Sequence, residues 1–163
     1  MVDEKKLASL ELFEGLPGHA LRALVGMSKE MRFAPKAVVF SPEQSSKWIY
    51  LLVEGSVRLT IHASPLPEPI TVAVLETPGQ AFGFSSAVGQ GHHNSSAETV
   101  TSVRVIAIDG QPFLDYLEKE PKVGVIVMRR LARVISRRLA AVRRLLLETI
   151  IDYERQSSST PEN

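Results

Sequence analysis

Residues 78–101 read P-G-Q-A-F-G-F-S-S-A-V-G-Q-G-H-H-N-S-S-A-E-T-V-T, and the interpretation of the whole chain depends on them. Glycines stand at positions 79 and 83, a short apolar turn follows, and a polar loop leads back to β-type sequence. Glycine beside a short run that can start a helix leaves backbone N–H groups exposed, and such groups can surround an anion. The stretch therefore predicts an anion-binding loop within a β structure.

Short strand candidates flank this loop on both sides. They lie at residues 38–40, 48–53, 57–61, 70–75 and 103–108. Glu54-Gly55-Ser56 is predicted to form a tight hairpin turn, and residues 64–69, with three prolines, a loop. Short strands at regular spacing with turn residues between them predict a β sandwich or an antiparallel β jelly roll (a double-stranded β-helix) over about residues 32–109.

Helical patterns stand at both ends of the β region. Apolar side chains recur at helical spacing within residues 3–13 and 18–27, which predicts two short helices. A third short helix is predicted at 111–117, and a long one from about Lys122 to Arg155, with Pro121 in its first turn. The fold class is α+β. We expect one domain over residues 1–155 and a disordered polar tail at 156–163.

The long helix carries an apolar stripe at steps of three and four residues. Its members are Leu131, Ile135, Leu139, Val142, Leu146 and Ile150. At about 1.5 Å per residue the helix is ~50 Å long, against ~30 Å for a small domain, so its own β roll cannot cover the whole stripe. We expect a homodimer in which the helix packs against its copy across a two-fold axis.

Composition excludes several classes of site. The 163 residues include no cysteine, which rules out disulfides, zinc–thiolate sites and iron–sulfur clusters. No apolar run approaches 18 residues, so we expect no membrane span, and the charged N-terminus lacks a signal-peptide pattern. We expect a cytoplasmic protein. No nucleophile elbow, phosphate-loop lysine motif or clustered carboxylate pair occurs, so we do not expect an enzyme.

Five segments in order resemble one family. They are L-F-E-G-L at 12–16, I-Y-L-L-V-E-G-S-V-R-L at 49–59, P-G-Q-A-F-G at 78–83, S-S-A-E-T at 95–99 and L-A-R-V-I-S-R-R-L at 131–139. Together they resemble the cyclic-nucleotide-binding domain, as found at the N-terminus of the catabolite activator protein and its relatives. The resemblance implies a small-ligand pocket formed by Phe82, Gly83, Phe84, Ser85, Ser86, Ser95, Ser96, Ala97 and Arg143.

The side chains that hold the ligand in that family differ here. The family's ribose-binding glutamate corresponds to Phe84, and its phosphate-binding arginine to Ser95. The pair of hydroxyl residues that contacts the purine corresponds to Val142 and Arg143. A charge-assisted hydrogen bond contributes about 1.5–3 kcal/mol, so losing the arginine alone weakens binding about ten- to a hundredfold. We expect the pocket to persist with weak or altered cyclic-nucleotide binding, and Arg143 is a candidate replacement for the missing phosphate partner.

Three features allow two interpretations each. His92-His93 is either a solvated loop tip, which we favour, or a metal or haem ligand. Phe84 either plugs the pocket, which we favour slightly, or stacks on a ligand. Seven arginines within 16 residues of the long helix form either a solvated face beside the dimer seam, which we favour, or a surface for nucleic acid, an acidic partner or an anionic membrane. These are Arg129, Arg130, Arg133, Arg137, Arg138, Arg143 and Arg144.

These observations predict a non-catalytic regulatory module that senses a ligand. A cyclic nucleotide or another small anionic ligand between the roll and the long helix shifts the helix, and a regulatory protein partner responds. One alternative is a dimeric interaction or scaffold protein with a vestigial pocket. The other is the sensor half of a transcription regulator. Because the sequence ends about ten residues beyond the helix, we expect direct DNA binding only if the chain is a fragment.

Overall fold

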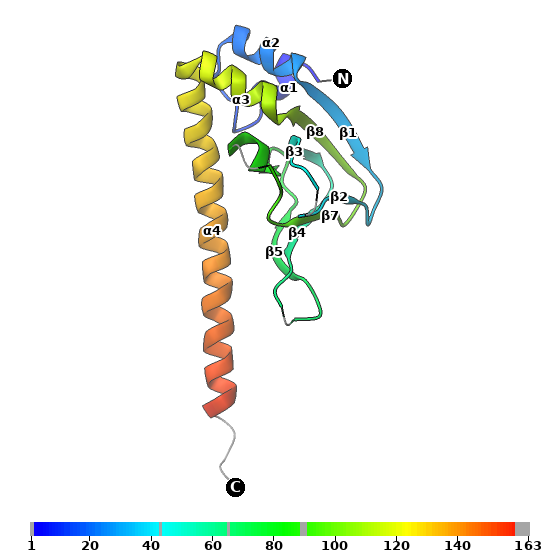
Figure 1. Cartoon of the computed structure of the whole chain (residues 1–163), viewed down its shortest axis with the longest axis vertical. Coiled ribbons are helices and arrows are strands. Elements are labelled where there is room, and N and C mark those ends of the chain that lie inside the picture. The colour runs from blue at the N-terminus through cyan, green and yellow to red at the C-terminus, as the bar shows by residue number, and fades with distance from the viewer. Residues whose placement is uncertain (1, 43, 65, 89–90, 159–163) are drawn as a thin grey trace.

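The chain folds into a β roll with short helices at one end and a long helix along one side (Figure 1). The computed structural model describes residues 2–42, 44–64, 66–88 and 91–158. The helices are α1 (Glu4–Ala8), α2 (Gly18–Gly26), α3 (Gly110–Lys119), α4 (Pro121–Ser158) and the 3-10 helix η1 (Phe84–Val88). The strands are β1 (Ser28–Phe33), β2 (Val38–Phe40), β3 (Trp48–Glu54), β4 (Val57–Ile61), β5 (Ile70–Leu75), β6 (Ala81–Phe82), β7 (Ser96–Thr99) and β8 (Val103–Asp109).

In the described residues these strands form two four-stranded antiparallel sheets. One has the order β1-β8-β3-β6 and the other the order β2-β7-β4-β5. Apart from β4 and β5, which are consecutive, strands that are neighbours in a sheet are distant in sequence, which is the connectivity of a jelly roll. The predicted α+β fold with a double-stranded roll is confirmed.

The prediction of a hairpin turn at Glu54-Gly55-Ser56 is wrong. β3 pairs with β6 and β8, whereas β4 pairs with β5 and β7, so this turn carries the chain from one sheet to the other. Gly55 has φ +95°, and a Cβ at this position would collide with the carbonyl oxygen of Ser102. The corner therefore requires glycine.

The β1-β8-β3-β6 sheet is the central layer, because apolar side chains cover both of its faces. Along β3, Ile49 and Leu51 belong to the core beneath the helices, while Tyr50 and Leu52 belong to the core between the two sheets. Side chains alternate between the faces of a strand, so an uninterrupted apolar run is what a strand buried on both faces needs. This explains the composition of residues 48–53.

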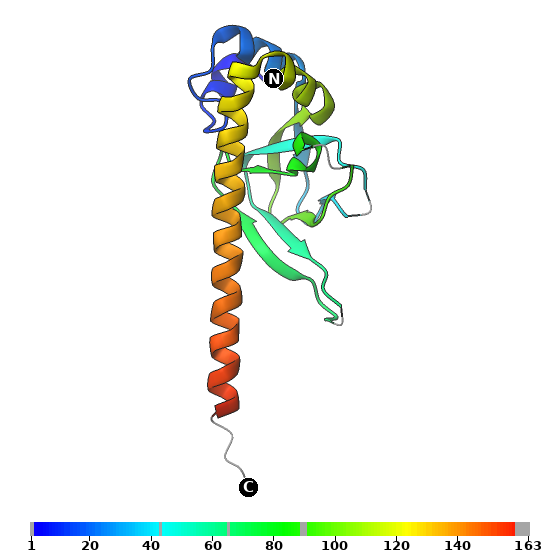
Figure 2. The same ribbon diagram turned by 60° about the vertical axis from the view of Figure 1, so that its left-hand side comes forward.

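Helix α4 starts in the core and leaves it. Pro121 is its first residue, as predicted, and Val123, Val127 and Leu131 are buried under the short helices. Leu131 is 3% exposed, so its assignment to the dimer stripe is corrected: it packs within its own chain. The helix has 38 residues and is ~57 Å long. Figures 1 and 2 show that it continues well beyond the roll.

Two predictions at the chain ends also change. The helix predicted at residues 3–13 ends at Ala8, with the Asp3 side chain accepting a 2.8 Å hydrogen bond from the Lys6 amide at its start. Helix α4 continues to Ser158, so the prediction of disorder is wrong for residues 156–158, and residues 159–163 lie outside the described residues. None of the described helices is long and apolar enough to cross a membrane.

Candidate functional site

A pocket of about 470 Å³ lies between the β roll and helix α4. The roll contributes Leu59, Ile61, Val72, Gly83, Phe84, Ser85, Val88, His93, Asn94 and Ser95, and the helix contributes Ile135, Arg138, Leu139 and Val142. The lining is apolar with a few polar groups, which is typical of a small-molecule site. A molecule in this pocket touches both parts of the fold.

Gly83 gives the backbone of the pocket its shape. It follows β6 with φ +70°, and a Cβ here would stand 2.9 Å from Tyr50 Cδ2 and 3.1 Å from Phe40 Cε1. The ring of Phe84, the first residue of η1, follows at once and is half-buried against the helical core. The predicted glycine-bounded loop is therefore present, and it leads directly into the pocket.

Arg138 brings a positive charge from α4 into the pocket. Its guanidinium carbon lies 5.0 Å from the centre of the Phe84 ring, and its Nη2 donates a 2.8 Å hydrogen bond to the carbonyl oxygen of Ala81. Burial lowers the pKa of Arg138 from its ordinary value. The side chain thus joins α4 to the strand that precedes the loop.

An aromatic cluster supports the pocket on the side of the roll. The His93 ring stacks on Phe40 with centroids 3.8 Å apart, and Phe40, Tyr50 and Phe82 pack on one another. His93 is only 6% exposed, and burial lowers its pKa, which favours the neutral ring. The loop-tip interpretation is therefore wrong for His93, although His92 is exposed. The described residues contain no group of three or more side chains suited to a metal ion.

The residues predicted from the sequence divide into two groups. Gly83, Phe84, Ser85 and Ser95 line the pocket. The others lie elsewhere: Phe82 and Ala97 are in the core between the sheets, Ser96 is in β7, Ser86 has a buried hydroxyl without a hydrogen-bond partner in the described structure, and Arg143 is exposed.

Arg138, and not the predicted Arg143, brings the positive charge of α4 into the pocket. The sequence does contain a signal for it. Arg138 follows the buried Leu131 by seven residues, which is two helical turns, so both lie on the same face of α4. A charged residue on the helix face that is buried nearer the N-terminus of α4 indicates where this face meets the pocket.

Other arginines of the basic stretch hold α4 to the N-terminal segment. Arg137 pairs with Glu11 at 2.6 Å, and Arg130 donates to the Leu12 carbonyl at 3.3 Å. Exposed ion pairs contribute at most about 1 kcal/mol each. The Arg137 side chain is still 62% exposed, as the interpretation of a solvated face expects, whereas Arg130 is half-buried and Arg138 lines the pocket, so that interpretation is wrong for these two residues.

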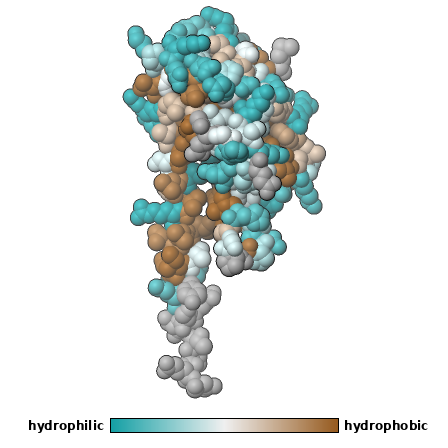
Figure 3. Space-filling model, in the orientation of Figure 1, coloured by the Kyte–Doolittle hydropathy of each residue, from teal (hydrophilic) through white to brown (hydrophobic). Residues whose placement is uncertain are grey.

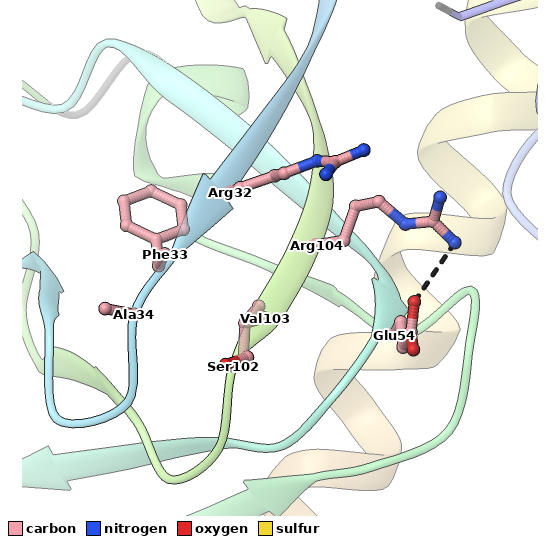
Figure 4. A pocket seen from close by; sticks show the side chains of 7 residues that line it. All are labelled: Arg32, Phe33, Ala34, Glu54, Ser102, Val103 and Arg104. Carbon is pink, nitrogen blue, oxygen red and sulfur yellow. Dashed lines mark ion pairs between the residues drawn. The ribbon is translucent and has the colours of Figure 1, made fainter.

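A second cavity of about 390 Å³ lies at the ends of β1, β3 and β8 (Figure 4). Arg32 and Arg104 are opposite each other in the register of β1 and β8. Arg104 pairs with Glu54 at 3.1 Å, and Arg32 contacts Glu30 at 3.5 Å. Both arginines therefore have carboxylate partners within the chain, and the first pocket is the stronger candidate for a ligand.

Residues 30–120 match the sequence profile of the cyclic nucleotide-binding domain, which is more than half of the chain. The chain belongs to the cyclic nucleotide-binding domain family. The match begins within β1, covers the rest of the β roll and α3, and ends just before α4. In this family member, Arg138 therefore lies outside the matched residues.

Known proteins with similar sequences or structures are consistent with this family membership. A CRP-like cAMP-activated global transcriptional regulator of Mycobacterium tuberculosis is 26% identical over 131 residues, which is 80% of this chain and 58% of that protein. The chain thus spans less than two thirds of the length of this relative. A structure from Geobacter metallireducens, assigned as a cyclic nucleotide-binding protein, has a TM-score of 0.74 and 28% identity, covering 85% of this chain and 99% of that one. The catabolite activator protein of Thermus thermophilus has a TM-score of 0.66 and 25% identity, covering 86% and 62%.

Proposed function

We propose that this cyclic nucleotide-binding domain is a non-catalytic regulatory module whose ligand occupies the pocket between the roll and α4. One observation carries the proposal: the pocket is lined by residues of η1 and also by Ile135, Arg138 and Leu139 of the long helix. A ligand that contacts both parts stabilises one position of α4 over others. A partner that binds α4 then senses whether the pocket is occupied.

The ligand class follows from the side chains present. The relative from M. tuberculosis is named as cAMP-activated, which supports a cyclic nucleotide as the first candidate. Phe84 and Ser95 take the positions of the family's ribose-binding glutamate and phosphate-binding arginine, and neither can make those charge-assisted hydrogen bonds. We therefore expect weak or altered cyclic-nucleotide binding. The absence of the arginine alone lowers the affinity by about ten- to a hundredfold.

Calorimetric titration with cyclic AMP, cyclic GMP and cyclic dinucleotides tests this proposal, with hydrogen exchange of α4 as the second readout. We expect weak binding of the first two, and slower exchange in η1 and α4 with any nucleotide that binds. Tight, saturable binding of cyclic AMP would show that the substitutions leave the site intact. Binding that leaves α4 unchanged would contradict the coupling.

A dimeric interaction protein is the second candidate, and the exposed stripe on α4 favours it. Leu139 and Leu146 are 68% and 59% exposed, and Ile135 and Ile150 are also exposed. Figure 3 shows apolar surface gathered on the part of α4 that extends past the roll. A second copy of the helix covers such a stripe most simply. In this alternative the dimer persists and no ligand changes α4.

A further inference from the structure

Arg138 is a partly buried cation, and the part of the chain that the structure describes places no carboxylate in the pocket beside it. None of the described residues that line the pocket is Asp or Glu. The ion pairs among the described residues do not include Arg138, and its one hydrogen bond goes to the neutral carbonyl of Ala81. A partly buried charge without a counter-ion is costly, and the lowered pKa of Arg138 reflects the same burial.

The other charged or titratable side chains nearby leave this charge uncompensated. Arg137, its neighbour on α4, is paired with Glu11 outside the pocket. Among the lining residues that the structure describes, His93 is the other titratable group, and burial favours its neutral form. The pocket therefore carries the net charge of one guanidinium.

The Arg138 guanidinium has more hydrogen-bond donors than its bond to Ala81 uses. It offers five N–H donors, and the bond to Ala81 takes one of them. Ser85, Asn94 and Ser95 on the opposite wall offer further donors. The rest of the lining is aliphatic or aromatic, so an anion that enters also needs an apolar body to displace water from the walls.

We propose that Arg138 is the anion-binding residue of this pocket, and that the ligand is a small molecule with a single anionic group on an apolar body. The anion lies against the helix, and the apolar part lies against Leu59, Ile61 and Val72. This inference rests on the proposed function, since it names the ligand class of the same pocket. It places the positive charge that holds the ligand on α4, where binding acts directly on the helix.

Matched pairs of anionic and neutral compounds test the inference on the full chain by calorimetry. Suitable pairs are benzoate with benzamide, 1-naphthoate with 1-naphthamide, and octanoate with octanamide, because each pair differs in charge and little in shape. We expect the best-fitting carboxylate to bind about ten- to a hundredfold more tightly than its amide. The same preference is expected in Arg143→Gln, which removes an exposed arginine of the same helix.

Two variants remove the free charge in different ways. Arg138→Gln deletes it, and Phe84→Glu places a carboxylate next to it, so that the second variant remains informative if the first does not fold. Both are expected to bind carboxylate and amide alike. A preference that survives in both folded variants would overturn the assignment of Arg138.

Failure of the inference differs from failure of the proposed function. If carboxylate and amide bind the wild type equally, the pocket stands as a binding site and the anion inference is overturned. If no member of any pair binds, the anion inference is overturned, while the pocket's proposed role is decided separately by the titration with cyclic nucleotides.

Discussion

The guanidinium carbon of Arg138, on the long helix, lies 5.0 Å from the centre of the Phe84 ring at the start of η1. A cation over an aromatic face is attracted by the ring's quadrupole, by about 0.5–2 kcal/mol depending on its exposure. By the resemblance to the family, Phe84 corresponds to the ribose-binding glutamate, and a carboxylate at this position would neutralise the cation. The contact joins α4 to η1, and the described residues of the pocket supply no counter-ion for the positive charge.

Gly83→Ala is expected to destabilise the fold. The residue has φ +70°, and a Cβ would stand 2.9 Å from the Tyr50 ring and 3.1 Å from the Phe40 ring. Left-handed backbone strain and overpacking together lower the free energy of unfolding by about 2–4 kcal/mol. Urea denaturation measures the change. Gly91→Ala is the control, because a Cβ at Gly91 meets nothing within 4 Å, and an unchanged midpoint for Gly83→Ala would contradict the account.

His93 is expected to make stability depend on pH. Burial lowers its pKa below 6.5, so the unfolded chain binds a proton more readily than the folded one. This part of the stability is complete above about pH 6.5 and decreases as the pH falls from there toward the folded-state pKa. His93→Phe keeps the stack on Phe40 and removes the titration. Its unfolding free energy should therefore fall less than that of the wild type between pH 7.5 and pH 5.5.

His92→Phe is the matched control for this experiment, because His92 is exposed. Its unfolding free energy should follow that of the wild type across the same pH range. Parallel curves for the wild type and His93→Phe would show that His93 does not titrate differently in the two states.

Leu146→Glu is expected to abolish the proposed dimer. Leu146 is 59% exposed on the stripe, and a charge in a helix seam is costly because it loses its hydration. Sedimentation equilibrium at tens of micromolar should give a dimer for the wild type and a monomer for the variant. Arg144→Glu changes the opposite side of the helix and should remain dimeric. A monomeric wild type would remove the dimer from the account.

The fold could be predicted from local patterns, and its main error has a physical cause. Alternating residues such as Val57, Arg58 and Leu59 do have alternating burial, and α4 begins at Pro121 as predicted. The turn at Gly55 was misassigned because a short glycine turn has the same composition whether it joins two paired strands or two sheets. Only the pairing of distant strands, which local sequence does not encode, distinguishes these cases.

The candidate site was predicted in part, for a similar reason. Gly83, Phe84 and Ser85 are consecutive after β6, and Ser95 directly precedes β7, so the glycine and strand patterns of the sequence were enough to place them. Arg138 was missed because periodicity shows which residues share a helix face but does not show which face meets the pocket. That rotation is fixed by Val127 and Leu131, which pack in the core about three and two turns earlier.

Calorimetric titration of cyclic AMP into the wild type and into the double variant Phe84→Glu, Ser95→Arg tests the central claim most directly. The claim is that the pocket is retained, whereas Phe84 and Ser95, in place of the family's glutamate and arginine, make its binding of cyclic nucleotides weak. We predict weak binding by the wild type and affinity at least about a hundredfold higher in the double variant, since two charge-assisted partners return. Tight binding by the wild type, or no gain in a folded double variant, would contradict it.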